Sequence, residues 1–314
     1  MARSSRIWLA ASIAFLGIFS LFGNADESPY YLTPWRYGAI AWIEEEPADP
    51  AFFITRLDRT LGRVFSFWEL DPIEPHPRWA EAPTWKKWMG SERLYMTEIR
   101  DYADRSTWKL PAPSWEGVRL WPLVVVVYPD GDSMRRLTGR TCEGWFSYSW
   151  TGLPGRRRLL DMLPALLVVH LTSSEGTLAH ELTHWLTFQY LFLEDGRIDR
   201  TPTYLLEGMA ELCEELFPRE DVDRFVGSGG RWGSTLLDIA AEACLTSDLP
   251  WPAKYVLGES FVAYLITQLG FDGFWSALPA WAESADELVG LYEPGWRQSL
   301  GLPMDCGTLA DEPE

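Results

Sequence analysis

The sequence predicts an α+β fold, because short stretches typical of β-strands come first and longer stretches typical of helices follow. Apolar, β-branched or aromatic residues predominate in three short stretches: residues 123–128, 145–150 and 166–171. Apolar residues recur at helical spacing in four longer stretches: residues 175–193, 203–217, 233–244 and 252–269. A run of strands before a run of helices favours a small sheet with helices segregated beside it.

The sheet is expected to start at residues 123–128, which read Leu-Val-Val-Val-Val-Tyr and run into a Pro-Asp-Gly-Asp turn. Such an apolar, β-branched run that ends at a turn is typical of a buried strand. Two helices are expected before it, at residues 53–68 and 91–105. The proline-containing residues 71–83 separate these two helices.

The chain is long enough for a sizeable core, with 314 residues of which 47% are hydrophobic. Residues 26–117 are expected to form an N-terminal segment with helices, and residues 118–310 a domain that carries the chemistry. The formal net charge is -18, with 45 acidic and 27 basic residues. Because affinity for nucleic acid comes from clustered Lys and Arg, nucleic acid is not an expected partner.

The N-terminus has the layout of a secretory signal. Arg3 and Arg6 precede an apolar run at residues 7–22, and small residues suit cleavage after Ala25. We therefore expect residues 1–25 to be a signal peptide and the mature chain to be exported, either secreted or periplasmic. The alternative is that residues 7–22 stay uncleaved as a membrane anchor. No later stretch of the sequence is long and apolar enough to span a bilayer.

Four cysteines are expected to meet an oxidising compartment after export, where an even number of cysteines can form disulfide bonds. Their spacings match no cysteine-based metal site. The sequence does not indicate which pairs form, and buried free thiols are the alternative. The four are Cys142, Cys213, Cys244 and Cys306.

Residues 180–184 carry the clearest chemical motif, His-Glu-Leu-Thr-His. On a helix, His180 and His184 stand one turn apart on one face, where they can hold one metal ion, and the pattern indicates zinc. Glu181 lies beside that face, where its carboxylate can take a proton from water and pass it to a leaving amine. The chain has only 4 histidines, so chance explains the pattern poorly. The alternative is two histidines satisfied within a core helix.

A third metal ligand is expected at Glu207. A catalytic zinc ion needs a third protein ligand and an open position. Glu207 lies in the stretch Leu-Leu-Glu-Gly-Met-Ala at residues 205–210, in the next expected helix. Burying a carboxylate in this apolar context is costly unless a cation meets it. The alternative is a solvated or salt-bridged glutamate.

Three stretches together carry a family resemblance: Leu-Ala-His-Glu-Leu-Thr-His at residues 178–184, Leu-Glu-Gly at residues 206–208, and residues 255–265, which begin at Tyr255. They resemble the gluzincin branch of zinc metallopeptidases, which includes thermolysin and the aminopeptidase-N-like enzymes. The resemblance covers roughly residues 120–301. It implies a zincin-like catalytic domain, in which a small sheet and an active-site helix are followed by a helical subdomain.

The resemblance also implies roles for further residues. Tyr255 matches a catalytic tyrosine of the aminopeptidase-N-like enzymes and would donate a hydrogen bond to the oxyanion. A carboxylate would orient one ligand histidine, and we favour Glu211 over Glu214 for this role. The strand at residues 166–171 would pair with an extended peptide substrate. His170 in that strand is assigned no role.

The expected function is that of an exported zinc peptidase, with a peptide or protein as substrate. The Gly-x-Met-Glu-Asn motif that precedes the zinc site in the aminopeptidase-N-like enzymes is absent from the sequence. The choice between endopeptidase and exopeptidase therefore stays open. Two alternatives also stay open: a zincin-fold binding or assembly module without turnover, and a zinc hydrolase that acts on a non-peptide bond.

Overall fold

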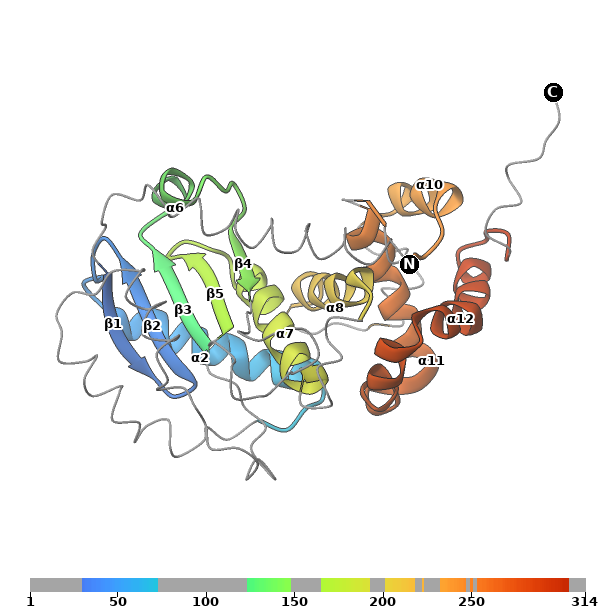
Figure 1. The fold of residues 1–314 in the computed structure, drawn as a ribbon, viewed down its shortest axis with the longest axis horizontal. Helices are drawn as coiled ribbons and strands as arrows, with labels where there is room; N and C mark the ends of the chain where they lie inside the picture. Colours follow the sequence, from blue (N-terminus) through green and yellow to red (C-terminus); the bar gives the residue numbers. More distant parts are fainter. Residues whose placement is uncertain are drawn as a thin grey trace, which may run out of the picture. The chain divides into compact units, whose positions relative to one another are not determined.

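The computed structural model describes residues 30–72, 123–147, 165–192, 201–217, 222, 232–246, 249–250 and 253–304. The expected signal or anchor at residues 1–25, the expected helix at residues 91–105 and Cys306 lie outside the described residues. The described elements fall into two compact units, which are taken in turn (Figure 1). The expected domain boundary near residue 117 stays a prediction.

A five-stranded mixed sheet belongs to the first unit and runs in the order β1-β2-β3-β5-β4. The strands are β1 (Tyr30–Trp35), β2 (Gly38–Ile43), β3 (Leu123–Tyr128), β4 (Gly144–Ser147) and β5 (Ala165–His170). The central strands β2, β3 and β5 are parallel, and the edge strands β1 and β4 are antiparallel to their neighbours. Strands β2 and β3 are buried along their whole length, and their sequences are accordingly continuous apolar runs rather than alternating ones.

The expectation that the sheet starts at residues 123–128 is wrong, because β1 and β2 precede β3. These two strands form a hairpin in which Trp35 is opposite Gly38. Pro34 within β1 and Gly38 at the start of β2 both weaken the sequence pattern of a strand. Pairing with β3 supplies the stability that the local sequence lacks.

Helix α6 (Gly131–Thr138) follows β3 where the sequence suggested only a turn. Asp130 caps its N-terminus, because its carboxylate accepts a hydrogen bond from the backbone N–H of Ser133 at 2.7 Å. Gly139 ends the helix with a φ of 72°, a conformation that favours glycine. Met134 of α6 is buried in the cluster formed by the sheet residues Val126 and Val168, so α6 covers one face of the sheet.

The helix expected at residues 53–68 and the four helices expected beyond residue 174 are confirmed. They are α2 (Pro50–Phe67), α7 (Glu175–Phe192), α8 (Thr203–Glu215), α10 (Ser234–Glu242) and α11 (Ala253–Glu283). Helix α2 begins in the first unit and continues from Thr55 in the second, to which the other four belong. Helix α11 is broken at Gly270, whose φ is 69°, directly after the expected helix end at residue 269.

Helix α12 (Ala285–Ser299) is an addition that the sequence did not predict. Three residues of α12 disfavour the interior of a helix: Gly290, Pro294 and Gly295. Local helix propensity therefore does not predict α12. Tertiary packing holds it instead, since Trp296 is fully buried and donates a hydrogen bond to the Ser260 hydroxyl at 3.1 Å.

Aromatic residues build the core of the second unit. The Trp68 ring, just after α2, stacks on Phe274 and meets Trp275 edge-on. Its indole N–H donates to the Thr183 hydroxyl of α7 at 3.3 Å, and its backbone carbonyl accepts from the Trp275 indole at 3.1 Å. Trp68 therefore links the end of α2 to both α7 and α11.

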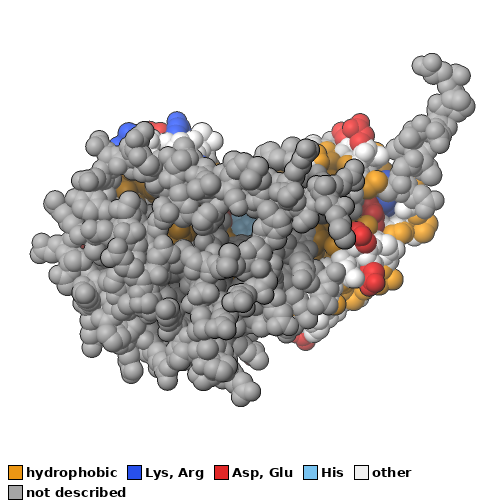
Figure 2. Space-filling model, in the orientation of Figure 1, with side chains coloured by type: hydrophobic (Ala, Val, Ile, Leu, Met, Phe, Trp, Pro, Cys, Tyr) orange, Lys and Arg blue, Asp and Glu red, His pale blue; other side chains and the backbone are white. Residues whose placement is uncertain are grey.

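The described residues confirm an α+β architecture with a small mixed sheet followed by helices. No helix among them combines the length and the apolar character that crossing a bilayer requires. On the face drawn in Figure 2, acidic and apolar side chains reach the surface where α10 and α12 lie. Leu237 of α10 and Leu291 of α12 are exposed apolar residues of these helices.

Candidate metal centre

Helix α7 presents the His-Glu-Leu-Thr-His motif and is held firmly at its start. The Ser174 hydroxyl accepts a hydrogen bond from the backbone N–H of Thr177 at 2.9 Å, which caps the helix. Glu175 in the first turn pairs with Arg59 and Arg63 of α2. Apolar residues occur on every side of α7 and most of them are buried, so packing fixes the direction in which the motif points.

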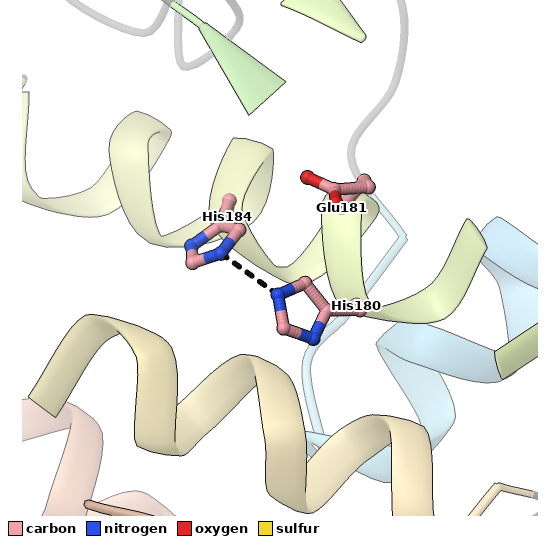
Figure 3. Close-up of side chains that lie close together, drawn as sticks. All are labelled: His180, Glu181 and His184. Atoms are coloured by element: carbon pink, nitrogen blue, oxygen red, sulfur yellow. Dashed lines mark hydrogen bonds between the residues drawn. The ribbon is translucent and has the colours of Figure 1, made fainter. Parts of the chain in front are cut away.

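His180 and His184 project from successive turns of α7, and their rings meet in an edge-to-face arrangement (Figure 3). Their Nε2 atoms are 3.2 Å apart. Glu181 lies beside the pair, with a carboxylate oxygen within 4.8 Å of a ring nitrogen of each histidine. The four-residue spacing thus brings together two ring nitrogens and one carboxylate that could hold a metal ion.

Glu207 of α8 faces the same two nitrogens. Its Oε2 is 3.2 Å from Nε2 of His184 and 3.7 Å from Nε2 of His180. The Glu207 side chain is 17% exposed, so its carboxylate is largely buried but still reached by solvent. The structure therefore brings Glu207 to the point where the two imidazoles meet, as the sequence predicts, and its role as a ligand stays a prediction.

Two further carboxylates from α8 face the other nitrogen of His180. Its Nδ1 is 3.0 Å from Oε2 of Glu214 and 3.5 Å from Oε1 of Glu211. Glu207, Glu211 and Glu214 are spaced by four and three residues, so all three lie on one face of α8. Both carboxylates considered for orienting a histidine are thus present, and Glu214 is the nearer one. With His180 they form a second group that could hold a metal ion.

Burial and mutual contacts shift the protonation of these groups. Burial alone would lower the pKa of His180, but its contacts with Glu207 and Glu214 outweigh burial and raise this pKa to about 10. Burial favours the neutral form of Glu207, yet His180 and His184 lower its pKa well below the ordinary range. A metal that binds here must therefore displace a proton, which couples metal affinity to pH.

Glu181 differs from the other carboxylates in its environment. It is 6% exposed, and this burial raises its pKa above the ordinary value even though both histidines act in the opposite direction. A glutamate with a raised pKa is better matched to proton transfer near neutral pH than an exposed one. Its placement suits a general base, whereas Glu207 suits a ligand that stays ionised.

The three atoms that face one another fit a zinc ion. Tetrahedral zinc with bonds of roughly 2.0–2.2 Å to nitrogen and oxygen separates its ligand atoms by about 3.3–3.6 Å. The separations between the two Nε2 atoms and Oε2 of Glu207 are 3.2, 3.2 and 3.7 Å. Two imidazoles and one carboxylate are also a donor set found in catalytic zinc sites. The three residues predicted as ligands are thus close enough to hold one metal ion, and their role as zinc ligands stays a prediction.

Tyr255 and Lys254, at the start of α11, also reach Glu207. Burial, together with the charge of Glu207 and a hydrogen bond to it, raises the pKa of Tyr255 above its ordinary value. The Tyr255 hydroxyl is thus a neutral donor beside the three candidate ligands. The Lys254 ammonium lies 3.7 Å from Oε1 of Glu207 and 5.1 Å from the centre of the Tyr255 ring.

Lys254 was not singled out from the sequence. The one sequence feature that could have indicated Lys254 is its position directly before Tyr255, in a chain with few lysines. The expected ligands and the expected oxyanion donor are brought together by α7, α8 and α11, all within the second unit. Helix α8 packs against both of the others.

His170 lies in the first unit and is not part of this cluster. It ends β5, and its Nδ1 is 2.9 Å from the Thr172 hydroxyl. The pairing of β5 with a substrate stays a prediction.

The cysteines are only partly described. Cys213 of α8 is a buried, unbridged thiol. This leaves at most one disulfide bond among the other three cysteines, and Cys306 lies outside the described residues. Two bridges are therefore excluded, and a buried thiol, the alternative considered from the sequence, holds for Cys213.

Comparisons of the chain with protein families, with curated proteins and with solved structures find no match. The functional argument therefore rests on the geometry of α7, α8 and α11.

Proposed function

We propose that the protein is an exported zinc-dependent peptidase with a zincin-like catalytic domain. The observation that carries the proposal is the convergence of His180, His184 and Glu207, whose facing atoms are 3.2 to 3.7 Å apart. One zinc ion is the expected cofactor. When bound, zinc would act as a Lewis acid that polarises a carbonyl group and lowers the pKa of water.

The residues around the ligands support hydrolysis rather than metal binding alone. Glu181 is the proposed general base, which takes a proton from the attacking water and delivers it to the leaving amine. Tyr255 is the proposed donor to the oxyanion that forms on the substrate carbonyl. Glu214 and Glu211 would hold the His180 ring in place through Nδ1.

Export and the substrate class are proposed from the sequence. Residues 1–25 have the layout of a signal, or of an anchor if they stay uncleaved. A peptide or protein is the proposed substrate, and nucleic acid is not a proposed partner of a chain with a net charge of -18.

The decisive experiment combines metal analysis with a peptide library. The purified protein is expected to contain about one zinc ion, as a single catalytic site requires, and to cleave library peptides. Glu181→Gln is expected to keep its zinc and to lose turnover by a factor of at least about 100, because the general base is gone. Glu287→Gln, an exposed glutamate of α12, is the matched control and should change neither.

Three outcomes would contradict the proposal in different ways. Protein without zinc after incubation with the metal would remove the metal centre. Full zinc occupancy without cleavage of any peptide would favour a binding or assembly module. Cleavage of ester substrates alone would favour a hydrolase of non-peptide bonds.

A further inference from the structure

The two carboxylate oxygens of Glu207 have different partners. Oε2 faces the ring nitrogens of His180 and His184, whereas Oε1 is the oxygen that approaches the Lys254 ammonium, at 3.7 Å. The Lys254 side chain is 21% exposed, so the ion pair is shielded from most of the solvent. This partial burial strengthens an ion pair relative to one at the surface.

A carboxylate can bind a metal ion through one oxygen or through both. If both oxygens of Glu207 were free to turn, bidentate binding would fill the position that a catalytic zinc site must keep open. An ammonium that attracts Oε1 favours the orientation in which Oε2 alone meets the metal. The carboxylate ligands of metal sites are commonly held in this way by a neighbouring donor.

The charge of Lys254 does not increase the metal affinity of the site. A positive charge close to a metal ion repels it, so the lysine lowers metal affinity through its charge alone. We propose that Lys254 is a positioning residue, which holds Oε1 of Glu207 away from the metal and so keeps the ligand monodentate and one coordination position open. This inference rests on the proposed zinc centre and adds Lys254 to the residues around it.

Cobalt provides a test that needs no substrate. The full chain is loaded with Co²⁺, whose visible absorption is intense in four-coordinate sites and weaker in five-coordinate ones. The wild type is expected to give the intense spectrum. Lys254→Met is expected to give a weaker, five-coordinate spectrum, and Lys254→Arg, which keeps the cation, is expected to restore the intense one.

Zinc affinity, measured by competition with a chromophoric chelator, separates positioning from a structural role. Lys254→Met is expected to bind zinc at least about threefold more tightly, because a repelling charge is lost and a second oxygen becomes available. If Lys254 only stabilised the fold, Lys254→Met would loosen the site and bind zinc less tightly than the wild type. Arg135→Met, which removes an exposed cation of α6 in the first unit, is the matched control and should leave affinity and spectrum unchanged.

The results that overturn the inference are distinct from those that overturn the metal centre. A Lys254→Met protein with the wild-type cobalt spectrum refutes positioning, and so does weaker zinc binding accompanied by a lower urea midpoint. In either case the zinc centre itself stands. A wild type that takes up neither zinc nor cobalt refutes the centre and, with it, the role of Lys254.

Discussion

Gly208 of α8 and Gly258 of α11 approach so closely that a β-carbon on either would collide with backbone atoms of the other helix. Glycine is required where two backbones come this near. The contact sets the distance between the helix that carries Glu207 and the helix that carries Tyr255. The separation of these two candidate site residues is therefore set by two residues that have no side chain.

Gly258→Ala is expected to destabilise the protein by about 3 kcal/mol or more, because the obstacle is rigid backbone rather than a flexible side chain. Zinc occupancy should fall as well, since α8 must move and take Glu207 with it. Urea unfolding and metal analysis measure the two effects. Gly290→Ala in α12 is the matched control: its β-carbon would meet no atom within 4 Å. This control should be neutral or stabilising by about 0.5–1 kcal/mol, and equal losses in both variants would contradict the argument.

Glu214→Gln is expected to weaken zinc binding by about tenfold, the lower end of the range for residues that orient a ligand. Glu211→Gln should have a smaller effect, because its carboxylate is 3.5 Å from Nδ1 of His180 whereas that of Glu214 is 3.0 Å away. Chelator competition at fixed pH ranks the two variants. A larger loss in Glu211→Gln would reverse the assignment and restore the one favoured from the sequence.

Removing the metal should lower the melting temperature without unfolding the protein. The second unit is held by buried aromatic residues such as Trp68 and Phe274, which do not depend on a metal ion. Zinc that binds only the folded state should stabilise it by about 2.7 kcal/mol at a free concentration 100 times its Kd. Differential scanning calorimetry with and without a chelator tests this. The melting temperature of His184→Ala should not respond to zinc, and a chelator-treated wild type without cooperative unfolding would contradict the prediction.

Cys213 is expected to resist alkylation in the folded protein. Burial raises the pKa of its thiol from 9.0 to about 12, so the reactive thiolate is scarce at pH 8. Because the folded pKa is the higher one, its contribution to stability is complete below pH 9 and is lost between pH 9 and about 12. Mass spectrometry after iodoacetamide treatment should find Cys213 labelled only in urea. Rapid labelling of the native protein would show that α8 opens readily.

The sequence predicts α7 well because two independent signals coincide there. Apolar residues recur through residues 175–193, and the two histidines are at a helical spacing. The helix observed, Glu175–Phe192, ends one residue earlier. Glu207 was also accessible to sequence reasoning, because a carboxylate within the apolar stretch at residues 205–210 is costly to bury unless a cation meets it.

Other features depend on packing that no local pattern reveals. Strands β1 and β2 contain a proline and a glycine that argue against them, and pairing with β3 overrides this preference. Lys254 reaches Glu207 only because α8 and α11 pack at a glycine contact. Glu214 is nearer than Glu211 to Nδ1 of His180. This difference depends on how α8 is rotated about its axis, which the spacing of the two residues in the sequence does not predict.

Thr183 lies between the two histidines and is fully buried, and its hydroxyl accepts from the Trp68 indole and donates to the Ala179 carbonyl. Leu182 is fully buried as well. The two interior positions of the motif, which metal chemistry leaves free to vary, are thus constrained by the core. A saturation-mutagenesis screen of this chain should therefore find five intolerant positions in residues 180–184: three that govern activity and two that govern protein abundance.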